Sequence, residues 1–291
     1  MKLKSALTIV LAFFCISAIF CQTNGKYHSI EEALKNPSNV VELQLSGIKE
    51  KLPKDIKKFD NLETVKLINL PKEYDLNDAF QKLGKYTSVK KIYLYGNPQN
   101  ELPSSLSGIK TLEFIELNKN LANNLKTIID QLIKLEHFKS LSLRSMGLSK
   151  LPDNITQIKI VELNLDNNPR LNLVKEFDLL ATLKLEILNI SASTFKVVPE
   201  NIKNLKNLKR VVIERNKENF NNAESYKNLS QLKNLTELNI QGNFFGSLDP
   251  EVEKLNFLKL IEIDGNCIVD ERLENLKKLL PDTKIQNEIP C

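Results

Sequence analysis

One spacing recurs ten times along this chain: apolar-x-x-apolar-x-apolar-x-x, often followed by Asn, as in the stretch "LTELNIQGN". The copies begin at Val40, Leu62, Val89, Leu112, Phe138, Ile160, Leu185, Leu208, Leu235 and Leu258. Successive starts are 22 to 27 residues apart. A repeat of this length predicts small structural units that stack on one another, because a single unit cannot bury its apolar face alone.

Each copy contains the pattern of a short strand. Two apolar residues that flank a single residue, such as Leu238 and Ile240, share one face of a strand and would point into a core. The residues between them would point outward, onto a shared surface. An Asn side chain can bond backbone groups where the chain turns, and it ends six copies: Asn97, Asn120, Asn168, Asn216, Asn243 and Asn266. Four copies carry Ile48, Leu70, Met146 or Ser193 instead, so we expect irregularity on the N-terminal side and in the middle.

Over residues 40–266, this pattern and its period resemble the leucine-rich repeat family. The resemblance implies an α/β solenoid, or horseshoe, with a parallel concave sheet. The copies also alternate between short units of 22–23 residues and long units of 25–27 residues. Short units carry an apolar residue that usually precedes Pro, whereas long units have helical spacing, as in residues 125–132. We therefore predict a convex side on which extended or 3-10 segments alternate with helices.

The N-terminus predicts export. Residues 1–21 combine a basic head, Lys2 and Lys4, with an apolar run, which is typical of a signal peptide cleaved near Cys21 and Gln22. A membrane anchor and a lipid attached to Cys21 are the alternatives. With the signal removed, the mature chain has no apolar segment long enough to span a membrane. We expect a secreted or cell-envelope protein.

Both ends of the repeat array need caps, because a solenoid otherwise exposes its core. Residues 22–39 are expected to form a linker and a capping helix, in which Ser29 and Glu32 have capping-box spacing. This entry segment resembles that of bacterial exported leucine-rich repeat proteins. Residues 267–291 are expected to form the other cap, with a short strand around Ile285.

The mature chain keeps two cysteines, Cys267 and Cys291, both near its end. In an oxidising compartment such a pair favours a disulfide over a metal site. Two free thiols are the alternative. A disulfide would tie the C-terminal tail to the last repeat.

No arrangement of residues predicts catalysis. The two histidines, His28 and His137, are far apart in the repeat register, and neither a metal-spaced Cys/His cluster nor a Gly-rich phosphate loop is present. We therefore expect a non-catalytic protein without metal or cofactor. Four carboxylates at outward strand positions are expected to form a solvated charged face rather than a calcium site: Asp166, Glu214, Glu262 and Asp264. The net charge of +5 falls to +3 without the signal, which disfavours nucleic acid as a partner.

The resemblance also implies that the concave sheet binds a protein ligand. Because neighbouring strands lie about 4.8 Å apart, seven outward residues should form one patch: Lys66, Ile68, Tyr93, Tyr95, Phe114, Glu116 and Arg144. Exposed Tyr, Phe and Arg are typical of interaction hot spots, although scattered aromatics are also common on protein surfaces. We predict a monomeric module that binds a protein whose identity the sequence does not give. A structural component of the cell envelope and a carbohydrate binder are the alternatives.

Overall fold

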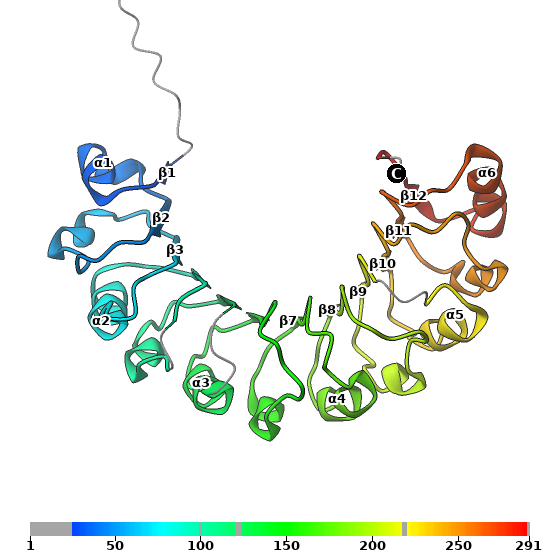
Figure 1. Ribbon diagram of the computed structural model, residues 1–291, viewed down its shortest axis with the longest axis horizontal. Helices are drawn as coiled ribbons and strands as arrows, with labels where there is room; N and C mark the ends of the chain where they lie inside the picture. The colour runs from blue at the N-terminus through cyan, green and yellow to red at the C-terminus, as the bar shows by residue number, and fades with distance from the viewer. Residues whose placement is uncertain (1–24, 99–100, 120–123, 217–219, 290–291) are drawn as a thin grey trace, which may run out of the picture.

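The computed structural model describes residues 25–98, 101–119, 124–216 and 220–289. These residues form a curved solenoid in which twelve strands, β1 to β12, make one parallel sheet in chain order. The sheet lines the inner side of the arc, the helices stand on its outer side, and β1 and β12 lie at opposite ends (Figure 1). The fold is a leucine-rich repeat solenoid.

The strands are longer in the first half of the arc. A two-residue strand, β1 (Lys26–Tyr27), is followed by four five-residue strands: β2 (Glu42–Ser46), β3 (Thr64–Ile68), β4 (Lys91–Tyr95) and β5 (Phe114–Asn118). The remaining strands have three residues each: β6 (Ser140–Ser142), β7 (Glu162–Asn164), β8 (Ile187–Asn189), β9 (Arg210–Val212), β10 (Glu237–Asn239), β11 (Leu260–Glu262) and β12 (Lys284–Gln286). The strands of the N-terminal side pair over more residues than those of the rest of the arc, so the gaps in the Asn pattern there do not shorten the strands.

The convex side alternates between two kinds of segment, as predicted. The short units carry 3-10 helices: η2 (Lys54–Lys58), η3 (Ser104–Gly108), η5 (Asp153–Gln157), η6 (Glu200–Asn204) and η7 (Pro250–Leu255). The long units carry α-helices: α2 (Leu76–Tyr86), α3 (Leu125–Leu132), α4 (Leu173–Leu180), α5 (Ala223–Leu229) and α6 (Asp270–Leu279). Four of the 3-10 helices follow directly on a Pro, and η7 begins with one. Pro suits these starts because its fixed φ is compatible with a first turn and its missing N–H is not needed there.

The N-terminal end has a strand that the repeat pattern does not contain. Ahead of α1 (Ile30–Lys35) and η1 (Pro37–Asn39), the carbonyl oxygen of Gly25 accepts hydrogen bonds from the backbone of β2 and the residue before it, so β1 is added through main-chain contacts. In α1, Ser29 Oγ accepts the Glu32 N–H at 3.1 Å, the contact that the capping-box spacing predicts. At the other end, β12 includes Ile285, where the final strand was expected.

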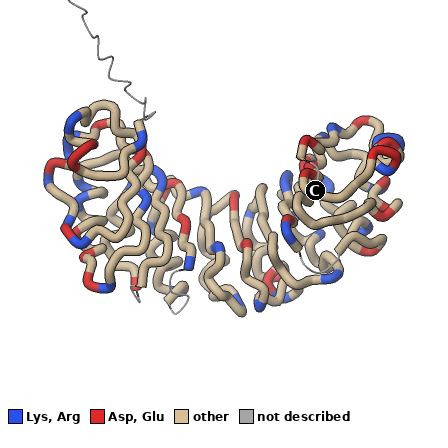
Figure 2. The backbone as a smooth tube through the Cα atoms, turned by 45° about the horizontal axis from the view of Figure 1, so that its top comes forward, with Lys and Arg blue, Asp and Glu red and all other residues tan. Residues whose placement is uncertain are grey.

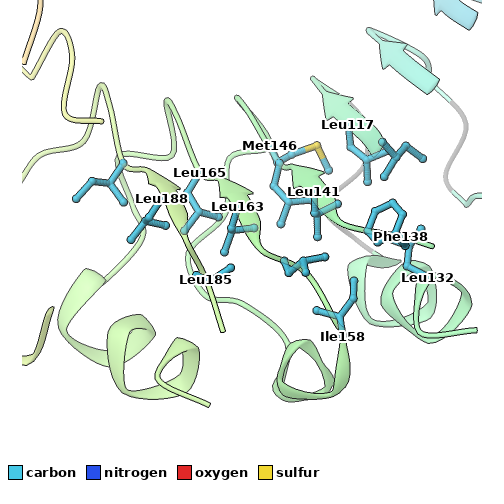
Figure 3. Close-up of a cluster of buried hydrophobic side chains, with 14 of the residues drawn as sticks. Leu117, Leu132, Phe138, Leu141, Met146, Ile158, Leu163, Leu165, Leu185 and Leu188 are labelled. Carbon is cyan, nitrogen blue, oxygen red and sulfur yellow. The ribbon is translucent and has the colours of Figure 1, made fainter. Parts of the chain in front are cut away.

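The apolar residues of successive copies form one continuous core between the sheet and the convex segments. Leu117, Leu141, Leu163 and Leu188 come from four neighbouring strands and line up along the inside of the stack (Figure 3). Residues such as Leu132 and Ile158 meet them from the convex side. Burial of a Leu-sized side chain stabilises a fold by about 1.5–3 kcal/mol, so this stack accounts for much of the cohesion between units.

The repeated Asn residues bond backbone groups inside the stack. Asn168, which is 1% exposed, donates through Nδ2 to the carbonyl oxygens of Leu143 and Leu165, both at 2.9 Å. Its Oδ1 accepts the N–H of Leu148 at 3.0 Å. Three other repeat Asn residues make equivalent bonds to neighbouring backbone: Asn97, Asn243 and Asn266. Asn120 lies outside the described residues, and the Asn216 amide has no partner within them.

Four of the five short units are also bonded to the long unit that follows them. The backbone next to the apolar-Pro turn of the short unit meets a polar side chain from the helix of the next long unit. Four turns show this contact: Leu52 O with Lys82 Nζ, Leu102 O with Gln131 Nε2, Leu151 N with Glu176 Oε2, and Val198 O with Asn228 Nδ2. The helix of a long unit therefore supplies a side-chain partner for a backbone group of the preceding 3-10 unit.

Candidate functional site

The concave face is built from rows of outward side chains. Alternate residues of each strand point to this face, and residues in register on neighbouring strands lie side by side. The register places Lys66 opposite Tyr93 and Tyr93 opposite Glu116, while Ile68 lies opposite Tyr95. Basic and acidic residues are interspersed along the whole arc of the backbone (Figure 2).

Two aromatic rings are packed together on β4 and β5. The ring centroids of Tyr93 and Phe114 are 4.9 Å apart with an interplanar angle of 47°. Lys66 Nζ lies 5.2 Å from the centroid of the Tyr93 ring and 2.9 Å from Glu42 Oε1. Both rings remain partly exposed. The arrangement offers a contact surface with aromatic area and a cation held against it.

The environment of Tyr93 is acidic as well as apolar. Burial is the main cause that raises the pKa of its hydroxyl, and Lys66 opposes this shift. The carboxylates of Glu116, Glu42 and Glu162 raise the pKa further. Three negative groups therefore act on this position.

Glu116, Tyr95 and Arg144, three other predicted patch residues, differ in what they contact. Glu116 adjoins the aromatic pair and accepts a hydrogen bond from Asn118 Nδ2 at 3.3 Å. Tyr95 has Lys119 Nζ at 5.5 Å from its ring centroid. Arg144 is engaged elsewhere, because its Nε lies 2.9 Å from Asp166 Oδ2. The structure thus joins Lys66, Tyr93, Phe114 and Glu116 into one cluster and commits Arg144 to an ion pair beside it.

The expectation of a solvated charged face is wrong at Asp166, which is only 3% exposed. Arg144 and Arg215 both contact its Oδ2, the latter at 3.5 Å, and Arg215 also pairs with Glu214. Burial raises the pKa of the Asp166 carboxyl, and the two arginines oppose that shift. The concave curvature crowds these side chains, so an outward position is not necessarily a hydrated one.

Asp264 is also buried, at 8% exposure, but its surroundings differ. Its Oδ2 accepts hydrogen bonds from Gln241 Nε2 at 2.8 Å and Gln286 Nε2 at 3.0 Å, and its Oδ1 accepts the N–H of Ile289 at 3.1 Å. Burial raises the pKa of this carboxyl, but the hydrogen bonds outweigh it and leave the pKa lowered. Asp264 therefore ties the C-terminal tail to the sheet.

Several residues of this face were not singled out by the repeat pattern. Lys119 and Arg215 occupy the turn that leaves the strand, where their φ values of 52° and 50° are left-handed, and their side chains return over the concave face. Glu162, Arg210 and Glu237 occupy the first outward position of their strands, and Arg210 Nη1 lies 2.6 Å from Glu237 Oε2. Phe114 is the only predicted patch residue at a first outward position. Listing that position for every strand would have identified Glu162, Arg210 and Glu237.

The structure also bears on the expectations about metal binding, membrane helices, the signal peptide and the disulfide. Among the residues that the structure describes, no group of three or more His, Cys, Asp and Glu side chains is placed to hold a metal ion. Within the same ranges, no helix combines the length and apolar character needed to cross a membrane. The expected signal peptide, residues 1–21, lies outside the described residues, as does Cys291, so the disulfide from Cys267 stays a prediction.

Comparison with protein-family models and with curated proteins finds no match. Among solved structures, the chain is similar to a leucine-rich repeat protein of Leptospira interrogans. The sequence identity is 22%, the match covers 89% of this chain and 99% of the other, and the TM-score is 0.35. The assignment of the fold rests on the repeats and the parallel sheet of the chain itself.

Proposed function

We propose that this chain is a non-catalytic, exported module that binds a protein partner through its concave sheet. The contact would centre on Lys66, Ile68, Tyr93, Tyr95, Phe114, Glu116 and Arg144. Export is proposed from the signal-like residues 1–21, and monomeric assembly from the capping segments at both ends of the array. A leucine-rich repeat fold is suited to protein interaction, although a fold alone does not determine function.

The observation that carries this proposal is the partly exposed pair of Tyr93 and Phe114 beside Lys66 and Glu116. Aromatic rings supply large contact area at low entropic cost, and hot spots in protein interfaces are enriched in Tyr and Arg. Arg144 is exposed at the edge of this cluster and would join the contact while it keeps its ion pair with the buried Asp166.

An affinity pull-down with residues 22–291 as bait tests the proposal. The matched control is a triple variant, Tyr93→Ala, Tyr95→Ala and Phe114→Ala, whose circular dichroism spectrum should match that of the wild type because none of these residues is fully buried. We expect a protein that the wild-type bait enriches and the triple variant does not. Equal enrichment by both baits would move the interface to the convex side or to the C-terminal repeats.

Two alternatives give different results. A carbohydrate binder would show signals on a glycan array that disappear in the Tyr93 and Tyr95 variants, since aromatic rings beside amide side chains also suit sugars. A structural component of the envelope would remain in the envelope fraction without enriching any ligand.

A further inference from the structure

The centre of the concave face carries two serines where neighbouring strands carry large side chains. Ser140 and Ser142 are the outward residues of β6. In register, Ser140 lies between Phe114 on β5 and Glu162 on β7, whereas Ser142 lies between Glu116 and Asn164. An aromatic ring and two carboxylates therefore surround two small hydroxyl side chains. We refer to Tyr93, Phe114, Glu116, Ser142 and Glu162 as the β6 site.

The two carboxylates of the β6 site have no cationic partner within the described ranges. Glu116 accepts from the Asn118 amide at 3.3 Å, and Glu162 Oε2 accepts from Ser140 Oγ at 2.9 Å. Other acids on the same face, by contrast, are paired: Glu42 with Lys66 and Asp166 with Arg144. The β6 site thus holds two carboxylates without a cationic partner, beside acids of the same face that are paired.

A buried hydroxyl gives an independent indication of a ligand. Ser142 is 2% exposed, and its Oγ has no hydrogen-bond partner among the residues that the structure describes. A buried polar group without a partner costs about 1–3 kcal/mol, so such groups are rare in native proteins and mark places where a ligand or water completes the bonding. Because Ser142 shares its face with Glu116 and Asn164, its hydroxyl is directed toward the same side as the carboxylates.

The aromatic side chains of this region already receive cations from the chain itself. Lys66 Nζ lies 5.2 Å from the centroid of Tyr93, and Lys119 Nζ lies 5.5 Å from that of Tyr95. Phe114, which is partly exposed and nearest to the serines in register, has no such cation among the described residues. Its ring is available for the same kind of contact.

We propose that the β6 site binds an arginine side chain of the protein partner. A guanidinium carries five N–H donors in a planar fork and stacks on aromatic rings, so it can contact Phe114 with its face while it donates to Glu116 and Glu162. A shift of the side chains that cover Ser142 would open its hydroxyl to the same guanidinium. This inference rests on the proposed function and specifies the chemistry of the partner. A lysine has only three donors on a compact ammonium group and matches the site less well.

Titration with three short peptides tests the inference. Acetyl-Gly-Arg-Gly-amide is compared with its lysine analogue and with its citrulline analogue, which has nearly the same shape but no charge. Backbone amide signals of the ¹⁵N-labelled protein are followed by NMR. We expect the arginine peptide to shift signals of β5, β6 and β7 and the citrulline peptide to leave them unchanged. The double variant Glu116→Gln and Glu162→Gln should bind about three- to tenfold more weakly, because exposed ion pairs contribute modestly. Gln keeps a carbonyl oxygen that can still accept from Asn118 and Ser140.

A second double variant controls for net charge. Glu224→Gln and Glu253→Gln remove the same two charges from exposed convex positions and should leave binding unchanged. Equal shifts with the citrulline peptide, equal affinity of a lysine peptide, or unaltered binding by the Glu116 and Glu162 variant would overturn the assignment. If the pull-down finds a partner that needs the concave aromatics while the arginine peptide shows no preference, this inference fails and the proposed function stands. If capture does not need the concave face, the proposed function itself fails.

Discussion

Replacement of one buried repeat Asn provides the sharpest test of how the units are held together. Asn168→Ala removes four hydrogen bonds that the amide makes to backbone: Leu143 O, Leu165 O, Leu148 N and, at 3.3 Å, Asp166 O. Asp166 O still accepts the N–H of Ser145, so three groups are left without a partner. Each buried group left without a partner costs about 1–3 kcal/mol. Because the space left by the amide admits some water, we take the lower end for each group and expect a loss of about 3 kcal/mol in the free energy of unfolding.

The matched control is Asn234→Ala. Asn234 Nδ2 also bonds a neighbouring turn, at 2.8 Å from Lys206 O, but it lies in solvent, so water replaces the lost contact. We expect a change of less than about 1 kcal/mol. Guanidinium unfolding followed by circular dichroism measures both variants, and hydrogen exchange at the Leu148 amide reports the local effect. A loss of under about 1 kcal/mol in Asn168→Ala, with Leu148 still protected, would refute the idea that these amides hold the turns.

Three further predictions follow from the packing and charges. Gly84→Ala should destabilise the fold by about 1 kcal/mol or more in thermal unfolding, because a Cβ there would stand 2.8 Å from Gly108 O, whereas Gly108→Ala meets no atom within 4 Å and should be tolerated. Since the pKa of Asp166 is raised in the folded state, that state keeps the proton longer than the unfolded chain, and its contribution to stability falls as pH rises through this pKa. The stability of Asp166→Asn minus that of the wild type, each measured as the free energy of unfolding, should therefore be larger at pH 7 than at pH 3. An unchanged difference would contradict the shift in pKa. If Cys267 and Cys291 form a disulfide, Ellman titration of denatured, unreduced residues 22–291 should find no free thiol, and reduction should cost roughly 3–4 kcal/mol.

The repeats determined which parts of this fold the sequence could predict. The apolar spacing and the Pro residues each report a local contact, so the strands from β2 onward and the alternating convex segments followed from them. β1 could not be predicted, because backbone atoms around Gly25 form it and no side-chain pattern marks it. The burial of Asp166 was missed for another reason: Arg215 reaches it from two strands away, and spacing along one strand carries no information about such a contact.

The same distinction applies to the candidate site. Counting outward positions brought Lys66, Tyr93 and Glu116 to neighbouring strands, and the register agrees. It could not show that Arg144 is held by Asp166, or that Ser142 has no partner, because both depend on how side chains settle on a curved surface. That the patch binds a partner stays a prediction, which the pull-down tests.

Because four of the five short units are bonded to the helix that follows, a short unit and the next long unit together form the smallest segment that could be added or removed without loss of these bonds. A single unit removed from the array would set two helices or two 3-10 segments side by side and leave an apolar-Pro turn without the side chain that bonds it. A pair removed together, such as the 49 residues from Val40 to Ser88, would restore the alternation at the new junction. Related arrays should therefore differ in length by pairs, and each pair gained would widen the concave face by two strand spacings, about 9.6 Å.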